Sequence, residues 1–175
     1  MTLEKHIMDT MKEWQIKLGS IGSDMKLYYP KTSLYEYLKI SNDISCTELK
    51  EYIKKYLSVH AECLGEITVS HDDDRFCICI GKEGCRYVEQ NIPEPDFLKK
   101  FLEALKSQNM NIIFRIFEEY AMENSTELCV EHEAGGATEV LYLKDETVEP
   151  YVYYIEQNEF GITYHRFTSN EYKNL

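Results

Sequence analysis

The chain has 175 residues, of which 43% are apolar, and 31 acidic against 19 basic residues give it a formal net charge of −12. This length and apolar content are enough for one domain with a sizeable core. The negative charge opposes binding to nucleic acid and to anionic membrane surfaces, because both need cations that displace counterions from phosphate groups. It would attract a basic protein surface or a divalent cation, although acidity also simply keeps a protein soluble.

The amino-terminal segment is charged throughout and lacks the apolar stretch of a signal peptide. No apolar run approaches the ~20 residues that a membrane-spanning helix requires. We therefore expect a cytoplasmic location, and six free cysteines rather than disulfides.

Three helices are predicted in the amino-terminal third. Residues 3–18 carry apolar side chains at three- and four-residue steps, namely Leu3, Ile7, Met11, Trp14 and Leu18. A loop is expected over residues 20–30. Ser33 with Glu36, and Ser45 with Glu48, form capping-box patterns that open a short helix and a longer one through about Cys63.

Beyond residue 65 the pattern changes to short alternating runs. EITVS, RFCICI and CRYVEQ are predicted to form a three-stranded antiparallel meander, with GKEG as a hairpin turn. A helical hairpin or kinked helix follows over residues 97–120. Four further strands are then predicted, over residues 127–133, 138–145, 150–157 and 162–168.

Antiparallel strands that are segregated from helices indicate the α+β class. We predict a single α+β domain over residues 1–175 with three parts. These are a helical appendage over residues 1–44, a helix and meander over 45–92, and helices with a meander over 93–175.

Two pairs of stretches suggest an internal duplication. EITVSH at 66–71 resembles ELCVEH at 127–132, and YVEQN at 87–91 resembles YIEQN at 154–158. Chance similarity between strands is the competing explanation. In the duplicated arrangement His71 and His132 are equivalent, and they could meet to bind a metal or a ligand. The alternative is that each histidine only bonds a turn carbonyl.

The segment CICIGKEGCRY raises the question of a metal site. Cys77 and Cys79 share one face of a strand and Cys85 lies beyond the turn, but structural zinc normally needs two close ligand pairs. FCICI is apolar on both faces, which is typical of a central strand covered on both sides. We therefore predict that these cysteines fill the core, and we expect no metal ligands and no cofactor.

No motif for catalysis is present. The sequence lacks a G-x-S-x-G elbow, and Gly135-Gly136 lies between strands rather than in a phosphate-binding loop. The three aspartates from Asp72 to Asp74 do not have the ligand order of a calcium loop. We assign no catalytic residue.

The 14 tyrosines are the compositional excess. Tyrosine is enriched in recognition surfaces, because it offers a large amphipathic contact, but it is also a good strand former. Tyr151 and Tyr153 share one strand face and Tyr154 lies on the other. These three, with Tyr87 and the two histidines His71 and His132, are the candidate binding residues.

The opening LEKHIMDTMKEWQIKLG, followed by LYYPKTSLYEYL, resembles a family of bacterial proteins known only as a domain of unknown function. The resemblance implies a bacterial cytosolic protein and carries over no catalytic residues. In architecture alone, the order of elements is similar to type III secretion chaperones, which dimerise and hold partner segments. No obvious closing amphipathic helix is predicted after the last strand of this chain, which counts against that similarity.

We therefore expect a non-enzymatic, acidic protein that binds another protein with a basic surface, in a chaperone-like or adaptor-like role, with a homodimer as one arrangement. The alternative is an enzyme, or a protein that binds a small molecule or metal, with its site between the two sheet segments. His71, His132 or the cysteines would form that site.

Overall fold

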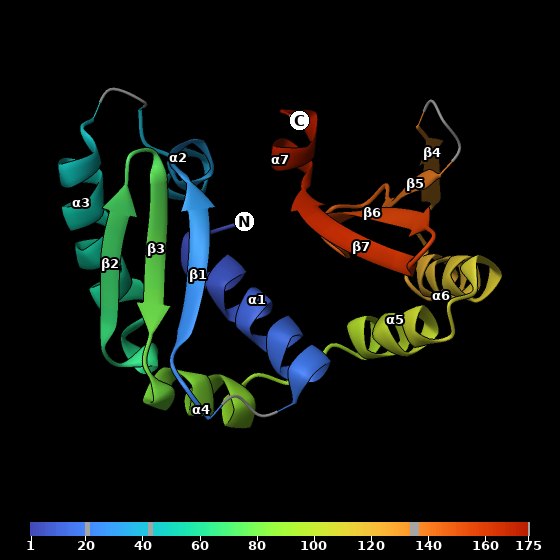
Figure 1. Ribbon diagram of the computed structural model, residues 1–175, viewed down its shortest axis with the longest axis horizontal. Coiled ribbons are helices and arrows are strands. Elements are labelled where there is room, and N and C mark those ends of the chain that lie inside the picture. The colour runs from blue at the N-terminus through green and yellow to red at the C-terminus, as the bar shows by residue number, and fades with distance from the viewer. Residues whose placement is uncertain (20–21, 42–43, 134–136, 175) are drawn as a thin grey trace. The chain divides into compact units, whose positions relative to one another are not determined.

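A computed structural model of the chain describes residues 1–19, 22–41, 44–133 and 137–174 (Figure 1). The chain divides into two compact units, Met1–Glu94 and Pro95–Leu175. The described residues form seven α-helices, a three-stranded antiparallel sheet and a four-stranded antiparallel sheet, which confirms the predicted α+β class. None of the described helices is both long and apolar enough to cross a bilayer.

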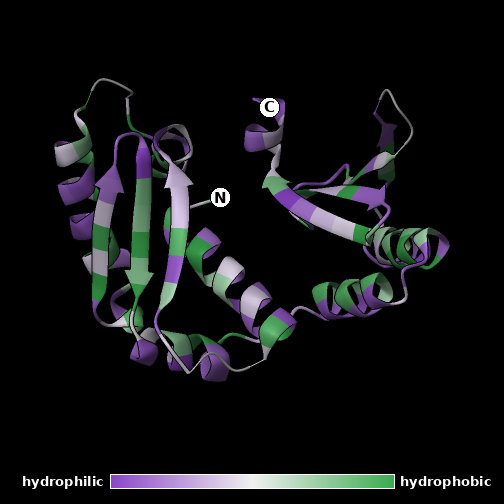
Figure 2. Cartoon of the chain, viewed as in Figure 1, coloured by the Kyte–Doolittle hydropathy of each residue, from purple (hydrophilic) through white to green (hydrophobic). Residues whose placement is uncertain are grey.

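The first unit contains the three-stranded sheet. Its elements are α1 (Leu3–Leu18), β1 (Met25–Pro30), α2 (Lys31–Leu38), α3 (Cys46–His60), a 3-10 turn η1 (Glu62–Leu64), β2 (Ile67–Asp72), β3 (Arg75–Ile80) and α4 (Lys82–Asn91). The strand order is β1-β3-β2, so β3 is central, as predicted. Figure 2 colours most of β3 as hydrophobic.

Two elements of this sheet were predicted wrongly. The predicted strand CRYVEQ belongs to helix α4, and its buried Cys85 and Val88 are spaced as on one face of a helix. Gly84 does not form a hairpin turn but lets α4 lie against η1, because a Cβ there would overlap the Leu64 carbonyl oxygen. The third strand is β1, which was expected to be loop, and it alternates buried and exposed residues.

The helices of the first unit follow the sequence signals only in part. The Ser45–Glu48 capping box opens α3 as predicted. By contrast, α2 begins at Lys31 without a side-chain cap. Trp14 and Leu18 of α1 are 44% and 64% exposed rather than buried. The last turns of α1 instead bury polar residues against α4, where Gln15 donates a 2.7 Å hydrogen bond to the Cys85 carbonyl.

The second unit begins with two separate helices, α5 (Asp96–Lys106) and α6 (Met110–Glu123), so the helical hairpin is present and not the alternative kinked helix. The four predicted strands follow as β4 (Leu128–His132), β5 (Thr138–Leu143), β6 (Tyr151–Asn158) and β7 (Gly161–Thr168), in the order β4-β5-β6-β7. A short helix not predicted from the sequence, α7 (Ser169–Lys173), ends the described chain and is opened by a capping box between Thr168 and Glu171.

An aromatic cluster joins the helical hairpin to this sheet. The Tyr153 ring is 1% exposed and lies 5.1 Å from Phe101, 5.1 Å from Phe117 and 5.9 Å from Phe97, measured between ring centroids. These rings meet edge to face, the arrangement that aromatic pairs prefer. The sheet face that carries Tyr153 is therefore the face covered by α5 and α6.

The predicted duplication does not extend to its second pair of stretches. YVEQN at 87–91 lies in helix α4, whereas YIEQN at 154–158 lies in strand β6. The first pair, EITVSH and ELCVEH, contributes β2 and β4, which are each at the edge of a sheet. The predicted equivalence of residues 87–91 and 154–158 was therefore wrong, because the two similar sequences form different secondary structures.

Hydrogen bonds of Gln108 connect the turn of the helical hairpin to the β6–β7 turn. Its Nε2 donates to the carbonyls of Leu105 and Ile162 at 2.9 and 3.1 Å, and its Oε1 accepts from the Ile162 N–H. Gly161, at φ 122°, lies directly against this amide, and a Cβ there would overlap Gln108 Oε1.

Replacing Gln108 with methionine keeps the volume of the side chain but removes both hydrogen bonds to Ile162. We expect the free energy of unfolding to fall by about 2 kcal/mol, because two partly buried backbone groups lose their partners. Urea denaturation measures the change. The matched control is Gln90→Met, at an exposed position; equal midpoints for the two variants would contradict the role given to Gln108.

A side-chain hydrogen bond connects α3 to α1 in the first unit: Tyr56 Oη donates to Glu4 Oε2 at 2.7 Å. Burial and this hydrogen bond raise the pKa of Tyr56 to about 12. Burial alone would raise the pKa of Glu4, but hydrogen bonds from Thr2 and Tyr56 hold it below its usual value.

We expect Tyr56→Phe to lower the free energy of unfolding by about 1 kcal/mol at pH 7. Because the pKa of Tyr56 is raised in the folded state, its stabilisation is complete below pH 10 and is lost as the pH rises towards 12. The difference in the free energy of unfolding between wild type and variant should therefore become smaller above pH 10. Urea titrations between pH 7 and pH 11 test this, and a constant difference across that range would show that Tyr56 does not carry the effect.

Candidate functional site

The predicted binding tyrosines lie in different environments. Tyr151 and Tyr153 are 3% and 1% exposed, so their side chains are part of the core of the second unit. Tyr154 is half-buried on the opposite face of the same strand. Tyr87 is half-buried on α4, where the charge of Cys63 and a hydrogen bond to it raise the pKa of the phenol.

The two candidate histidines lie in different units. His71 is exposed on β2, and its ring lies 5.3 Å from that of Phe76, its partner across the first sheet. His132 is exposed on β4 and contacts the carboxylate of Glu139, its partner across the second sheet. Each histidine thus interacts with a neighbouring strand of its own sheet.

The cysteines of CICIGKEGCRY are not together in the core. Cys77 and Cys79 are half-exposed, on the face of β3 opposite to the buried Phe76, Ile78 and Ile80. Cys85 is buried in α4. The prediction that β3 is covered on both faces was wrong, because its alternating burial shows a core on one face only. Within the described ranges, no group of three or more His, Cys, Asp or Glu residues is arranged to hold a metal ion.

The most distinctive polar surface is on the second sheet. We call it the tyrosine–carboxylate face: the side of β4–β7 turned away from α5 and α6, with Tyr142, Tyr154, Glu131, the adjoining Glu133, and Tyr172 of α7. Tyr142 Oη donates to Glu131 Oε1 at 2.7 Å, and Tyr172 Oη donates to the other oxygen of this carboxylate at 3.4 Å. Tyr154 Oη donates to Glu133.

Strand register explains how these side chains meet. Cys129 pairs with Tyr142 and Glu131 pairs with Val140, so Glu131 and Tyr142 lie on one face in neighbouring rows. The capping box of α7 fixes the short helix that brings Tyr172 to Glu131. Secondary structure therefore places three phenols around two carboxylates.

The electrostatics of this face keep the phenols neutral. The hydrogen bond to Glu131 and burial raise the pKa of Tyr142, and the hydrogen bond to Glu133 raises the pKa of Tyr154. Burial and the charge of Glu131 raise the pKa of Tyr172. The phenols donate hydrogen bonds to the carboxylates, and the strand residues on this face, all of them described, include no lysine or arginine. The face therefore combines aromatic surface with negative charge.

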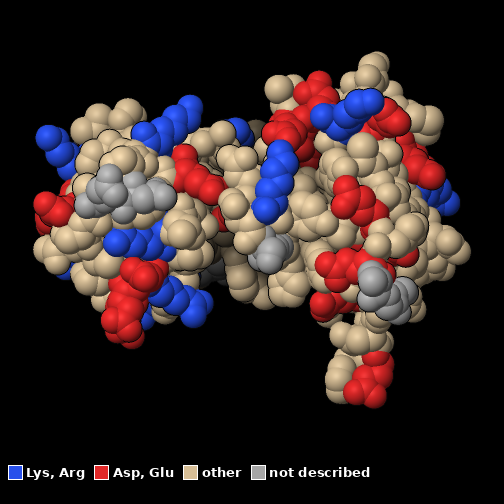
Figure 3. Space-filling view, turned by 90° about the horizontal axis from the view of Figure 1, so that it is seen from above, with Lys and Arg blue, Asp and Glu red and all other residues tan. Residues whose placement is uncertain are grey.

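Negative charge is concentrated around this sheet. Between Glu118 and Glu159 the sequence has twelve acidic residues and one basic residue, Lys144. Figure 3 shows extensive acidic surface on the visible face of the second unit. Lys144 itself forms a 2.9 Å ion pair with Glu127.

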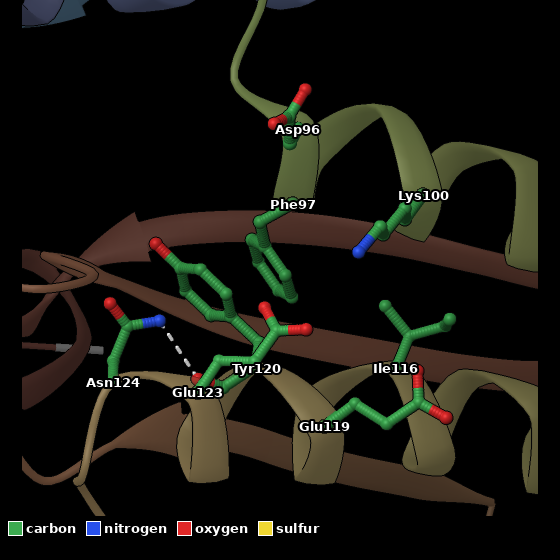
Figure 4. Close-up of a pocket in the computed structure, with 8 residues that line it drawn as sticks. All are labelled: Asp96, Phe97, Lys100, Ile116, Glu119, Tyr120, Glu123 and Asn124. Atoms are coloured by element: carbon green, nitrogen blue, oxygen red, sulfur yellow. Dashed lines mark hydrogen bonds between the residues drawn. The ribbon is translucent and has the colours of Figure 1, made fainter.

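A pocket of about 360 Å³ lies between α5 and α6 (Figure 4). Its wall includes Phe97 and Tyr120, whose rings stack with centroids 4.2 Å apart. Figure 4 shows Lys100 and Glu123 directed into the space between the helices. Its eight lining residues include no Cys, His or Ser. The pocket can hold an amphipathic group, and its charged side chains are one lysine and three carboxylates.

The first unit has two hollows of mixed character. One contains Cys79 and Thr68 with the cations Lys82 and Arg86, but also Asp24, Glu66 and Glu83. The other lies between α1 and β1, beside the exposed Trp14 and Tyr28. Neither hollow has charge of one sign or a set of converging ligands.

Of the tyrosine–carboxylate face, only Tyr154 was predicted from the sequence; the other four members are Tyr142, Tyr172, Glu131 and Glu133. A signal for three of them was present, because Glu131, Glu133 and Tyr142 occupy alternate positions on adjacent predicted strands. Tyr172 lies on α7, which was not predicted.

The corrected cysteine positions predict a reactivity order. Burial raises the pKa of the Cys85 thiol, so both access and thiolate content are low there. We expect iodoacetamide at pH 8 to modify Cys63, Cys77 and Cys79 well before Cys85, as measured by mass spectrometry of digests. Prior unfolding in urea is the control and should remove the order; early modification of Cys85 in the folded protein would contradict its placement.

Comparison with known protein families gives a match over the entire chain. A family model described as a domain of unknown function, E. rectale Gene description (DUF3877), matches residues 1–175. No curated protein and no solved structure matches the chain. Because the family model spans the entire sequence, the chain belongs to the DUF3877 family.

Proposed function

We propose that this chain is a non-enzymatic, cytoplasmic adaptor-like or chaperone-like protein that binds a positively charged segment of another protein. The tyrosine–carboxylate face is the observation that carries the proposal. It offers amphipathic rings, which are favoured in recognition surfaces, beside two carboxylates.

The type of partner follows from charge. Twelve acidic residues against one basic residue between Glu118 and Glu159 produce a field that draws a lysine-rich or arginine-rich segment towards the second unit. Hydrogen bonds from phenols orient Glu131 and Glu133 but leave oxygen lone pairs for further donors. A partner guanidinium or ammonium group can therefore bond to a carboxylate that is already held in place.

The test is the binding of a fluorescent, arginine- and lysine-rich peptide to the full chain, followed by anisotropy. We expect Glu131→Gln with Glu133→Gln to weaken binding by about fivefold or more, because two charges are lost while an acceptor for each phenol remains. Binding by the wild type should also weaken as salt is raised.

The matched control is Asp72→Asn with Asp73→Asn, which changes the net charge equally at exposed positions in the first unit. Asparagine also suits Asp73, whose φ is 47°. If the two double variants weaken binding equally, or if the wild type does not bind the peptide, the proposal is wrong.

A further inference from the structure

We infer that the free edge of β4 is the binding site for the proposed cationic partner. The partner binds there as an added fifth strand with alternating basic and apolar side chains. This inference rests on the proposed function and specifies how its partner is bound. An extended segment that joins the edge of a sheet gains affinity from main-chain hydrogen bonds and specificity from alternate side chains.

The hydrogen bonds between β4 and β5 show which backbone groups of β4 remain available. The Glu133 N–H donates to the Thr138 carbonyl at 3.3 Å, and the Lys144 N–H donates to the Glu127 carbonyl at 2.9 Å. In an antiparallel pair such bonds alternate along the strand. Odd-numbered residues of β4 therefore bond to β5, and Leu128, Val130 and His132 direct their N–H and C=O groups to the free edge.

This edge is exposed and lacks two common forms of protection. Val130 is 39% exposed, and Glu131 and His132 are exposed with it. Edge strands are commonly protected by lysine or proline, as β1 is by Lys26 and Pro30. β4, with the sequence LCVEH, has neither. No backbone hydrogen bond of Leu128, Val130 or His132 to a group outside the β4–β5 ladder is found within the described part of the chain.

The side chains of β4 define what a docked strand must carry. On the tyrosine–carboxylate face it would lie beside Cys129 and Glu131, near Glu133, where a lysine or arginine is favoured. On the other face it would lie beside the half-buried Leu128 and the exposed Val130, where an apolar side chain is favoured. The geometry therefore selects a segment in which basic and apolar residues alternate.

Charge also decides against a second copy of this chain at the same edge. Two β4 strands placed together would bring Glu127, Glu131 and Glu133 of one copy close to the same carboxylates of the other. Like charges on adjacent strands are destabilising. A heterologous, cationic strand is the occupant that complements this edge.

The test compares two synthetic peptides of identical composition, one in which lysine alternates with valine and one in which the lysines form a single block. We expect the full chain to bind the alternating peptide about tenfold more tightly, because only this peptide can place valines and lysines on opposite faces of the added strand. Hydrogen exchange should slow at the amides of Leu128, Val130 and His132 only with the alternating peptide.

Val130→Pro tests the edge directly. The Val130 N–H faces outward, so proline removes a docking donor without removing a β4–β5 hydrogen bond, and proline is tolerated on edge strands. We expect this variant to lose about tenfold in affinity for the alternating peptide. Val130→Thr, which keeps the donor and the branched shape, should bind like wild type, and circular dichroism checks that both variants are folded.

The outcomes separate this inference from the proposed function. The docking mode is overturned if the chain binds the two peptides with equal affinity, Val130→Pro has no effect and the outward amides are not protected. Binding would then be purely ionic. If neither peptide binds, the proposed function itself is overturned. Salt-dependent self-association that Val130→Pro abolishes would assign the edge to a second copy instead.

Discussion

Successive side chains of a strand point to opposite faces, and in each sheet of this protein only one face is packed against the long helices of its own unit. In the first sheet, Ile78 is fully buried while Cys77, its neighbour in sequence, is half-exposed. In the second, Tyr153 is enclosed by phenylalanines while Tyr154 reaches Glu133 on the other side. This one-sided packing leaves one face of each sheet without a long helix, and it determines which residues are available for binding.

The sequence predicts elements well where one period dominates a long segment. The hairpin α5–α6 and the four strands after it have clear periods and clear turns, and all were predicted. Helix α4 was not, because Gly81 and Gly84 resemble a hairpin turn, whereas Gly84 actually permits close packing on η1. Strand β1 was hidden because its alternation, in MKLYYP, is short and ends in a proline. In both cases tertiary packing outweighed the local signal.

Only the general chemical character of the candidate surface could be predicted from the sequence. An excess of tyrosine and acid is the basis for proposing a basic partner, but it does not reveal which face of each strand meets the helices. Tyr151, Tyr153 and Tyr154 are close together in sequence, yet only Tyr154 is on the face turned away from α5 and α6. The cysteines show the same limit, because FCICI suggests burial on both sides and only the sheet as a whole shows that one side lacks helices.

Neutral phenols that hold charged carboxylates on an exposed sheet face connect the fold to the proposed binding of a cationic segment. The most direct measurement is a two-dimensional NMR titration of the full, isotope-labelled chain with the peptide of alternating lysine and valine. The account predicts that chemical-shift changes concentrate on residues 127–133 and on Tyr142, Tyr154 and Tyr172. Changes concentrated around Cys77 and Cys79, or spread equally over acidic positions such as Asp72–Asp74, would contradict it.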